Sequence, residues 1–329
     1  MKIINLIFVA SSIYNVSYSQ QLHWEHIMVP SNKDAITILA TNSQGLLFAA
    51  TDYSLFRSYD RGKHWKNIEP IHMFDQPWNS PLEYIVAVDT NKLISSNCHG
   101  IYYSTNNGSS WTASSEIPIK EQILAIAADS LGKIFLSTEI GSYVSISSGC
   151  SWKFLPPYHA SPYSTNSTIY RCMISTSGYI LAQEWNDEYR GTFQFVVRNL
   201  NKDTLETFIV EETKELDVVC SSGSNLFYTS TVCDTLYYSN NNGKTWNASI
   251  SLIGGQSLRI IVESKIHKLF AARGNTIFFS SDQGHSWVRY ADPINSDEIK
   301  TMIIHQDGYL YVGARSGLFR SEVKVENIH

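Results

Sequence analysis

One short polar turn occurs five times in the chain with the same residues at fixed offsets. The copies are SYDRGKHW (58–65), STNNGSSW (104–111), SISSGCSW (145–152), SNNNGKTW (239–246) and SSDQGHSW (280–287). Each copy begins with serine and has glycine fifth and tryptophan eighth. Such regularity indicates an internal repeat, whose units must stack on one another to bury their apolar faces.

The spacing of the tryptophans gives the period of the repeat. Successive turn tryptophans are separated by 46, 41, 94 and 41 residues. Because 94 is twice 47, one repeat in the middle lacks the turn signature, and the period is 41 to 47 residues. Trp24 lies 41 residues before Trp65 and opens a similar segment, so we assign it to the series.

Apolar runs recur in the same order between the turns. The second run of each repeat appears seven times, as GLLFAAT (45–51), KLISSN (92–97), KIFLST (133–138), YILAQEW (179–185), NLFYTST (225–231), KLFAAR (268–273) and YLYVGAR (309–315). Each follows an apolar partner and a turn rich in Gly, Asn, Asp or Ser, which is typical of a β-hairpin. Four short strands per repeat predict an all-β fold, a seven-bladed β-propeller of four-stranded antiparallel blades.

The two ends of the chain are complementary. The last repeat, EIKTMIIHQDGYLYVGARSGLFRSEV, has three expected strands, whereas HWEHI near the start is a fourth strand without its first three. Pairing residues 22–28 with the strand near 317–323 leaves no unpaired edge. This predicts one closed domain over residues 20–329. An open solenoid of stacked hairpins, which needs no complementary ends, is the alternative.

The first residues have the layout of a secretory signal peptide. Lys2 precedes an apolar run from Ile3 to Ala10, and small residues follow at Ser17 and Ser19. We expect residues 1–19 to be cleaved and the protein to be secreted, in a periplasmic or extracellular location. A buried N-terminal strand is the alternative. No other stretch approaches the roughly 18 apolar residues that span a bilayer, so no membrane span is expected.

Charge argues against a nucleic-acid partner, and the cysteine spacing indicates neither a metal site nor a disulfide framework. The formal net charge is −5 with a pI near 6.1, and no run of Lys and Arg occurs, so nucleic acid is not an expected partner. The spacing of the cysteines resembles neither a disulfide framework nor a metal site. Cys220 and Cys233 are the favoured disulfide pair, and five free thiols are an equal alternative. The cysteines are Cys98, Cys150, Cys172, Cys220 and Cys233.

The recurring turn is interpreted as structural. Its glycine suits a backbone with positive φ, its third residue can accept backbone N–H groups, and its tryptophan is expected to cap the blade edge. Because Asn or Ser replaces Asp in three copies, too few carboxylates remain for calcium, and we expect neither metal nor cofactor. The residues given this role are Ser58, Asp60, Gly62, Trp65, Ser104, Asn106, Gly108, Trp111, Ser145, Gly149, Trp152, Ser239, Asn241, Gly243, Trp246, Ser280, Asp282, Gly284 and Trp287.

These five stretches resemble the Asp-box (BNR) motif, Ser-x-Asp-x-Gly-x-x-Trp. The motif occurs in the β-propellers of bacterial sialidases, sortilin-type receptors, xyloglucan-degrading enzymes and photosystem assembly factors. The resemblance implies a propeller over nearly the whole chain. It implies no single function, because these families do different things and the motif lies on the face opposite their sites.

The expected binding face is therefore the other one, formed by loops that enter the first strands and loops between second and third strands. Its aromatic, acidic and arginine side chains suit an oligosaccharide or a peptide. Ordinary solvated loop residues are the alternative. The candidate ligand-binding residues are His72, Trp78, His99, Glu139, Tyr158, His159, Glu184, Trp185, Asp187, Arg190, Arg273 and Arg315.

The sequence favours a non-catalytic, monomeric module that binds a glycan or an extracellular protein. The alternative is a glycoside hydrolase. A sialidase needs three arginines, a Tyr–Glu pair and an acid; Arg190, Arg273 and Arg315 could supply the first, but the Arg-Ile-Pro signature of that family is absent. For other glycosidases, Asp187 paired with Asp52 or Glu139 stays open.

Overall fold

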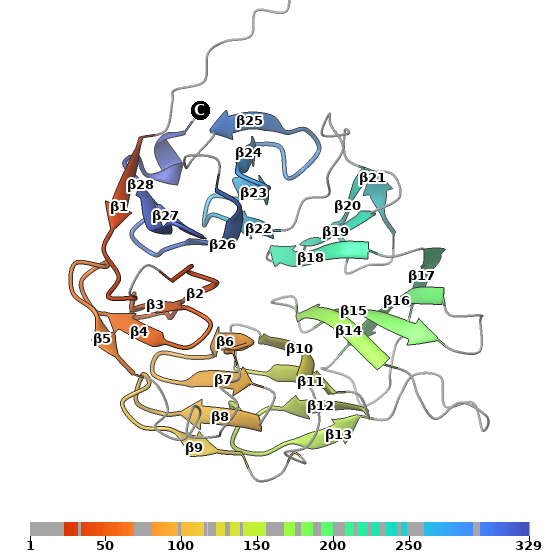
Figure 1. The fold of residues 1–329 in the computed structure, drawn as a ribbon. Helices are drawn as coiled ribbons and strands as arrows, with labels where there is room; N and C mark the ends of the chain where they lie inside the picture. Colours follow the sequence, from red (N-terminus) through yellow and green to blue (C-terminus); the bar gives the residue numbers. More distant parts are fainter. Residues whose placement is uncertain are drawn as a thin grey trace, which may run out of the picture.

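A computed structural model describes the chain from residue 23 to residue 328 with internal gaps (Figure 1). The gaps are 32–33, 69–80, 98–99, 115–116, 118–122, 129–131, 139–140, 156–167, 175–178, 187–191, 200–207, 214–215, 223–224, 231–234, 242–244, 249–259 and 292–296. Between residues 168 and 235 the backbone of the strands is described, and the side chains are not, apart from Ile180. The expected signal peptide lies outside the described residues.

The described strands form seven four-stranded antiparallel sheets. The first three comprise β2 (Ile38–Thr41), β3 (Leu47–Ala50), β4 (Leu55–Ser58) and β5 (Lys66–Asn67); β6 (Tyr84–Ala87), β7 (Leu93–Asn97), β8 (Gly100–Ser104) and β9 (Thr112–Ala113); and β10 (Ile123–Ala128), β11 (Ile134–Thr138), β12 (Gly141–Ser145) and β13 (Lys153–Leu155). The next three comprise β14 (Thr168–Ile174), β15 (Tyr179–Asn186), β16 (Thr192–Asn199) and β17 (Phe208–Thr213); β18 (Leu216–Ser222), β19 (Asn225–Ser230), β20 (Thr235–Ser239) and β21 (Asn247–Ala248); and β22 (Ile260–Glu263), β23 (Leu269–Arg273), β24 (Thr276–Ser280) and β25 (Val288–Ala291). The last comprises β1 (Trp24–Ile27), β28 (Gly317–Ser321), β27 (Leu310–Ala314) and β26 (Ile299–Ile304).

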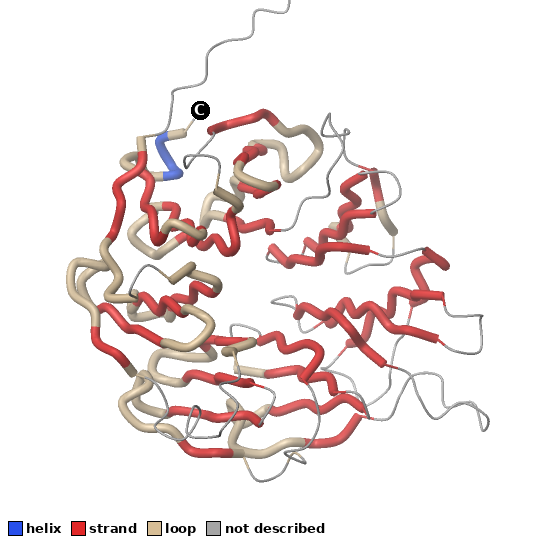
Figure 2. Tube along the Cα trace, viewed as in Figure 1, coloured by secondary structure: helices blue, strands red, loops and turns tan. Residues whose placement is uncertain are grey.

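The sheets are arranged as blades around a common axis (Figures 1 and 2). The first strand of each sheet contacts the first strand of the next, from β2 through β6, β10, β14, β18 and β22 to β26. Strand β26 in turn contacts β2. The prediction of an all-β propeller built from four-stranded antiparallel blades is confirmed.

The closing blade is assembled from both ends of the chain. Strand β1 pairs antiparallel with β28, with Trp24 opposite Ser321 and Ile27 opposite Leu318. The amide of Glu322 donates to the carbonyl of His23 at 3.0 Å, which extends the ladder past the last pair. The N-terminal strand therefore covers the outer edge that β28 would otherwise expose.

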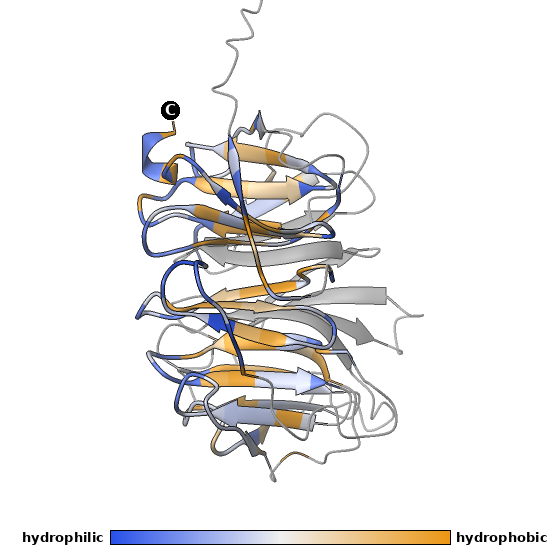
Figure 3. Cartoon of the chain, turned by 60° about the vertical axis from the view of Figure 1, so that its left-hand side comes forward, coloured by the Kyte–Doolittle hydropathy of each residue, from blue (hydrophilic) through white to orange (hydrophobic). Residues whose placement is uncertain are grey.

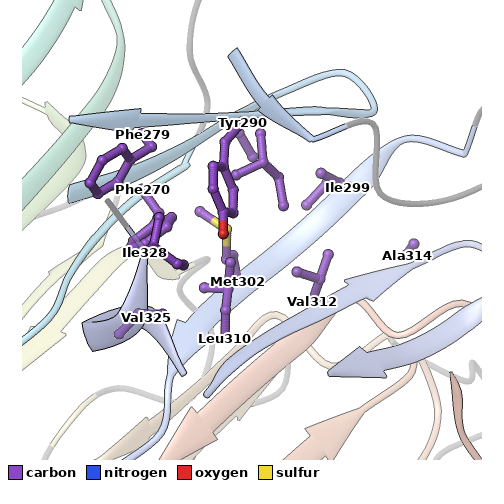
Figure 4. Close-up of a cluster of buried hydrophobic side chains, with 12 residues drawn as sticks. Phe270, Phe279, Tyr290, Ile299, Met302, Leu310, Val312, Ala314, Val325 and Ile328 are labelled. Carbon is purple, nitrogen blue, oxygen red and sulfur yellow. The ribbon is translucent and has the colours of Figure 1, made fainter. Parts of the chain in front are cut away.

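The core lies between neighbouring blades. One cluster joins Phe270 and Phe279 of the sheet β22–β25 to Met302 and Val312 of the closing blade (Figure 4). Another joins Ile27 and Tyr311 of the closing blade to Leu47 of the next sheet. Figure 3 shows the apolar colour along the strands and the hydrophilic colour at the turns. Burial between blades, which removes apolar surface from water, therefore holds the ring together.

A short 3₁₀ helix, η1 (Val325–Asn327), follows the last strand. No feature of the sequence had indicated this helix. Val325 and Ile328 are buried in the cluster that joins the last two blades, and Lys268 donates its ammonium to the carbonyls of Glu326 and Ile328. Two apolar residues three positions apart thus tie the segment after β28 to the preceding blade.

Candidate functional site

Each recurring turn is closed by its own serine and its own third residue. The Ser58 hydroxyl accepts the Gly62 amide at 2.8 Å, and Asp60 Oδ1 accepts the His64 amide at 2.8 Å. The same third-residue bond recurs in the other four turns, from Ser110 to Asn106, Ser151 to Ser147, Thr245 to Asn241 and Ser286 to Asp282. The prediction that these residues are turn acceptors is confirmed, and their oxygens are engaged within the turn.

Loss of one such acceptor has a calculable cost. Asp282→Ala removes the oxygens that accept the Ser286 amide at 2.9 Å and the Ser286 hydroxyl. We expect it to lower the free energy of unfolding by about 1 kcal/mol, as loss of a side-chain cap does. Denaturant unfolding measures the change. Ser281→Ala is the matched control, because this exposed neighbour makes no hydrogen bond with its side chain in the described structure, and an equal loss there would contradict the assignment.

The glycines have the positive φ expected of them. The values are +89° for Gly62, +79° for Gly108, +88° for Gly149 and +90° for Gly284. The residue before each of these glycines also has positive φ, which the sequence analysis missed; they are Arg61, Asn107, Ser148 and Gln283. The turn therefore contains two consecutive residues in the left-handed region, where only the second is glycine.

The residue before the glycine makes contact with the preceding blade. Arg61 Nε lies 3.5 Å from Asp307 Oδ2, and Asn107 Oδ1 accepts Asn42 Nδ2 at 3.0 Å. Ser148 accepts the ammonium of Lys92 at 3.2 Å. The recurring turns and the hairpin turns between first and second strands thus share one face, which we call the box face. The opposite face, with the inter-blade loops, is called the loop face.

The turn tryptophans lie in the seams between blades. Trp65, Trp111 and Trp152 each pack against an apolar cluster shared with the preceding blade. Trp65 donates its indole N–H to Gly62 at 3.0 Å, whereas Trp111 reaches the carbonyl of Ile68 at 2.8 Å. The neighbouring blade supplies part of the apolar surface that these rings contact. That they cap the blade edge stays a prediction.

Two of the candidate ligand-binding residues have described side chains. Arg273 ends β23, with its guanidinium 4.8 Å from the centre of the Phe278 ring, and Arg315 is exposed in the turn between β27 and β28. By register Arg273 corresponds to Ala314 of the neighbouring blade, so Arg315 lies one position further along the chain. Glu184 and Trp185 lie in β15, opposite Gln194 and Phe193. The remaining candidates lie outside the described residues, namely His72, Trp78, His99, Glu139, Tyr158, His159, Asp187 and Arg190.

Glu83 is a loop-face residue that the sequence analysis did not single out. It precedes β6, and its amide donates to the Ser96 carbonyl at 3.0 Å. Its Oε2 is buried with no hydrogen-bond partner, and burial raises the pKa of the carboxyl. The sequence places Glu83 just before a first strand. It could not predict that the carboxyl is buried, because burial depends on residues that pack around it in the fold.

The raised pKa of Glu83 predicts a pH-dependent stability. A carboxyl whose pKa is raised by folding stabilises the folded state below its unfolded pKa, and this contribution is lost as pH rises through the folded value. We therefore expect Glu83→Gln to raise the melting temperature at neutral pH, with the gain vanishing near pH 4, around the usual Glu value of about 4.3. Melting curves across this range test it. A gain that is independent of pH would contradict the assignment.

The described part of the chain has neither a metal-binding cluster nor a membrane-spanning helix. No group of three or more His, Cys, Asp and Glu residues there could hold a metal ion. None of its helices is long and apolar enough to cross a membrane. Cys150 is an exposed free thiol. The side chains of Cys220 and Cys233 lie outside the described residues, so their pairing stays a prediction.

The comparisons with known proteins agree with this architecture. The BNR/Asp-box repeat family model matches residues 237–248, and no curated protein matches the chain. A structure of YCF48 bound to D1 peptide is 15% identical, with 92% of this chain and 97% of that chain covered and a TM-score of 0.70. Virginiamycin B lyase from Staphylococcus aureus is 8% identical, with 92% and 98% covered and a TM-score of 0.70.

A third similar structure is an extracellular domain of the BT4673 two-component system from B. thetaiotaomicron. It is 12% identical, with a TM-score of 0.68, and the match covers 93% of this chain and 40% of that chain. At these identities the likeness concerns the fold. The chain is a β-propeller protein that carries BNR/Asp-box repeats.

Proposed function

We propose that this propeller is a secreted, non-catalytic, monomeric module that binds a glycan or an extracellular protein through its loop face. The proposal rests on one observation, that the polar side chains of the recurring turns are already hydrogen-bonded within those turns. Their serine, aspartate and asparagine oxygens close the turns themselves, and four of the five turn tryptophans, Trp65, Trp111, Trp152 and Trp287, pack against apolar clusters. The recurring motif is thus committed to the scaffold, and the variable loops of the opposite face are left for recognition.

Two further observations support this reading. Arg273 ends β23, and Arg315 follows the end of β27 in the neighbouring blade; both strands run toward the loop face, where guanidinium groups can bind carboxylates or hydroxyls. One similar propeller is a YCF48 bound to a peptide. Another is an extracellular domain of a two-component system. A protein ligand and a location outside the cytoplasm are therefore consistent with what proteins of this fold do.

A glycoside hydrolase is the second candidate, and Glu83 is the observation that favours it. A glycosidase needs one carboxyl that stays protonated near neutral pH to act as general acid. Burial of Glu83 raises its pKa in that direction. The partner carboxylate would come from the loop face, where Asp187, Glu184 and Glu139 are the candidates from the sequence.

One set of variants separates the candidates. The parent protein is tested for turnover on chromogenic glycosides and polysaccharides, and for capture of glycans and extracellular proteins. We expect binding without turnover, weakened by the double variant Trp185→Ala, Arg190→Ala and retained by Asp282→Ala. Turnover that is abolished by Glu83→Gln or Asp187→Asn would establish the hydrolase instead. Loss of binding in the Asp282 variant at full stability would refute the assignment of the loop face.

Secretion is tested separately from binding. The full chain is expressed in a cell that exports proteins, and the mass of the product is measured in the medium or periplasm. We expect a mature chain that begins near Gln20. Retention of the intact N-terminus inside the cell would contradict the signal peptide.

A further inference from the structure

The box face contains a pocket where the ring closes. Its volume is about 440 Å³, and it is lined by Tyr59, Asp60, Arg61 and Lys63 of the first box turn and by Tyr309 and Arg320 of the closing blade. This volume lies within the range of small-molecule sites. We propose that the pocket binds a sugar-sized ligand that carries one anionic group, a carboxylate, a sulfate ester or a phosphate ester. The proposal is independent of the loop face.

The charges that line the pocket favour an anion. Three of its six lining residues are cationic, and Asp60 is the single acid. That carboxylate is already engaged, because Oδ1 accepts the His64 amide at 2.8 Å and Oδ2 lies 2.5 Å from the His64 ring. Lys63 is exposed and makes no ion pair or hydrogen bond with its side chain in the described structure. A ligand anion would therefore meet at least one uncommitted positive charge.

Arg320 lines the pocket and is held from outside it by Glu25. Its guanidinium bonds Glu25 through Nη2, whereas Nε is buried and has no partner. The buried hydroxyl of Tyr311 lies beside this guanidinium. Unpaired buried polar atoms are costly. Because Nε is buried, a ligand oxygen can accept from it only if the side chain turns toward the pocket.

A buried carboxylate behind the wall holds Arg61 in place. Asp307 faces inward, with Oδ1 2.8 Å from His305 Nδ1, and His305 Nε2 donates to the Gly45 carbonyl at 2.9 Å. Burial opposes ionisation of Asp307, but the hydrogen bonds from His305 and the Tyr309 amide outweigh it and lower the pKa of the carboxyl. The carboxylate thus anchors Arg61 from behind at 3.5 Å.

The aromatic residues of the pocket suit a sugar ring. Tyr59 is 62% exposed, which is unusual for so large a side chain, and the Arg57 guanidinium lies 4.5 Å from its ring centre. Tyr309 lies under Arg320 at 5.0 Å. An aromatic face stacks on the apolar face of a pyranose, and the adjacent cations can hold its anionic substituent. The combination points to an acidic, sulfated or phosphorylated monosaccharide unit.

Calorimetric titration with four sugars tests the proposal. The probes are glucuronate, glucose 6-sulfate, glucose 6-phosphate and neutral glucose. We expect at least one anionic sugar to bind, glucose not to bind, and the affinity to fall as sodium chloride is added. The anionic probe that binds best identifies the carboxylate, sulfate or phosphate source. Failure of all three anionic sugars to bind at millimolar concentrations would overturn the proposal.

Charge reversal at Lys63 assigns the binding to this pocket. Lys63→Glu is expected to weaken binding roughly tenfold or more, a loss of at least about 1.4 kcal/mol, with no change in melting temperature. Lys265→Glu is the matched control, since Lys265 is an exposed lysine in the β22–β23 hairpin turn of the same face, outside the pocket. Equal weakening by both variants would overturn the proposal. The Trp185, Arg190 double variant should bind the sugar as the parent does. Failure of the proposed loop-face function can therefore be told apart from failure of this pocket proposal.

Discussion

Gly149→Ala is expected to lower the free energy of unfolding by about 2 to 5 kcal/mol. Alanine in the left-handed region costs about 1 to 2 kcal/mol, and φ is +88° here. A Cβ at this position would lie 2.3 Å from Ile94 Cδ1 of the preceding blade, and overpacking of this kind adds about 1 to 3 kcal/mol. Denaturant unfolding of the two proteins measures the sum.

Gly308→Ala separates the two contributions. Gly308 has φ of +87°, but a Cβ there would meet only the Lys324 side chain, at 3.5 Å or more. The control should therefore lose about 1 to 2 kcal/mol, from backbone strain alone. If both variants lose the same free energy of unfolding, the contact between the third recurring turn and the preceding blade adds nothing to the cost of Gly149→Ala.

Deletion of residues 20–27 is expected to lower the melting temperature sharply. The deletion removes the whole ladder to β28 and the Trp24 ring that packs against the last interblade cluster. It also removes Ile27, which is 6% exposed and lies in the cluster that joins the closing blade to the first. The exposed edge of β28 should promote association, which gel filtration would detect.

Two point variants test the same strand without deleting it. Ile27→Ala should lower the free energy of unfolding by about 2 to 5 kcal/mol, because it empties a buried site between two blades. His26→Ala should cost little, since that exposed ring contacts Phe319 at 4.9 Å between centroids. An undiminished melting temperature in both the deletion and the Ile27 variant would refute a ring closed by β1.

Local chemistry explains why so much of the fold could be predicted from the sequence. The third residue of each turn, such as Asp60 or Asn106, accepts an amide four residues on, so its role depends on neighbours within the motif. The glycines need positive φ for the same local reason. The assignment of Trp24 to the series is supported by its packing against a blade seam like the other tryptophans.

Contacts between distant segments explain what could not be predicted. Arg61 was an ordinary turn residue in the sequence, and its contact with Asp307 exists because the ring brings the first turn beside the last hairpin. Burial of Glu83 and the pocket between Tyr59 and Arg320 arise in the same way. The loop-face candidates remain predictions, because most of them lie outside the described residues and the two described arginines show only that each lies at the loop-face end of a second strand.

The pairing of β1 with β28 also orders events during synthesis. The strand that is made first finds its partner only among residues 317–321, after the rest of the propeller has been translated. Contacts of such long sequence separation form late. Until then Trp24 and Ile27 have no closing blade to pack against, and the nascent chain carries two unpaired strand edges. A ribosome stalled before β28 would therefore hold an open arc of blades, prone to pair with a second nascent chain.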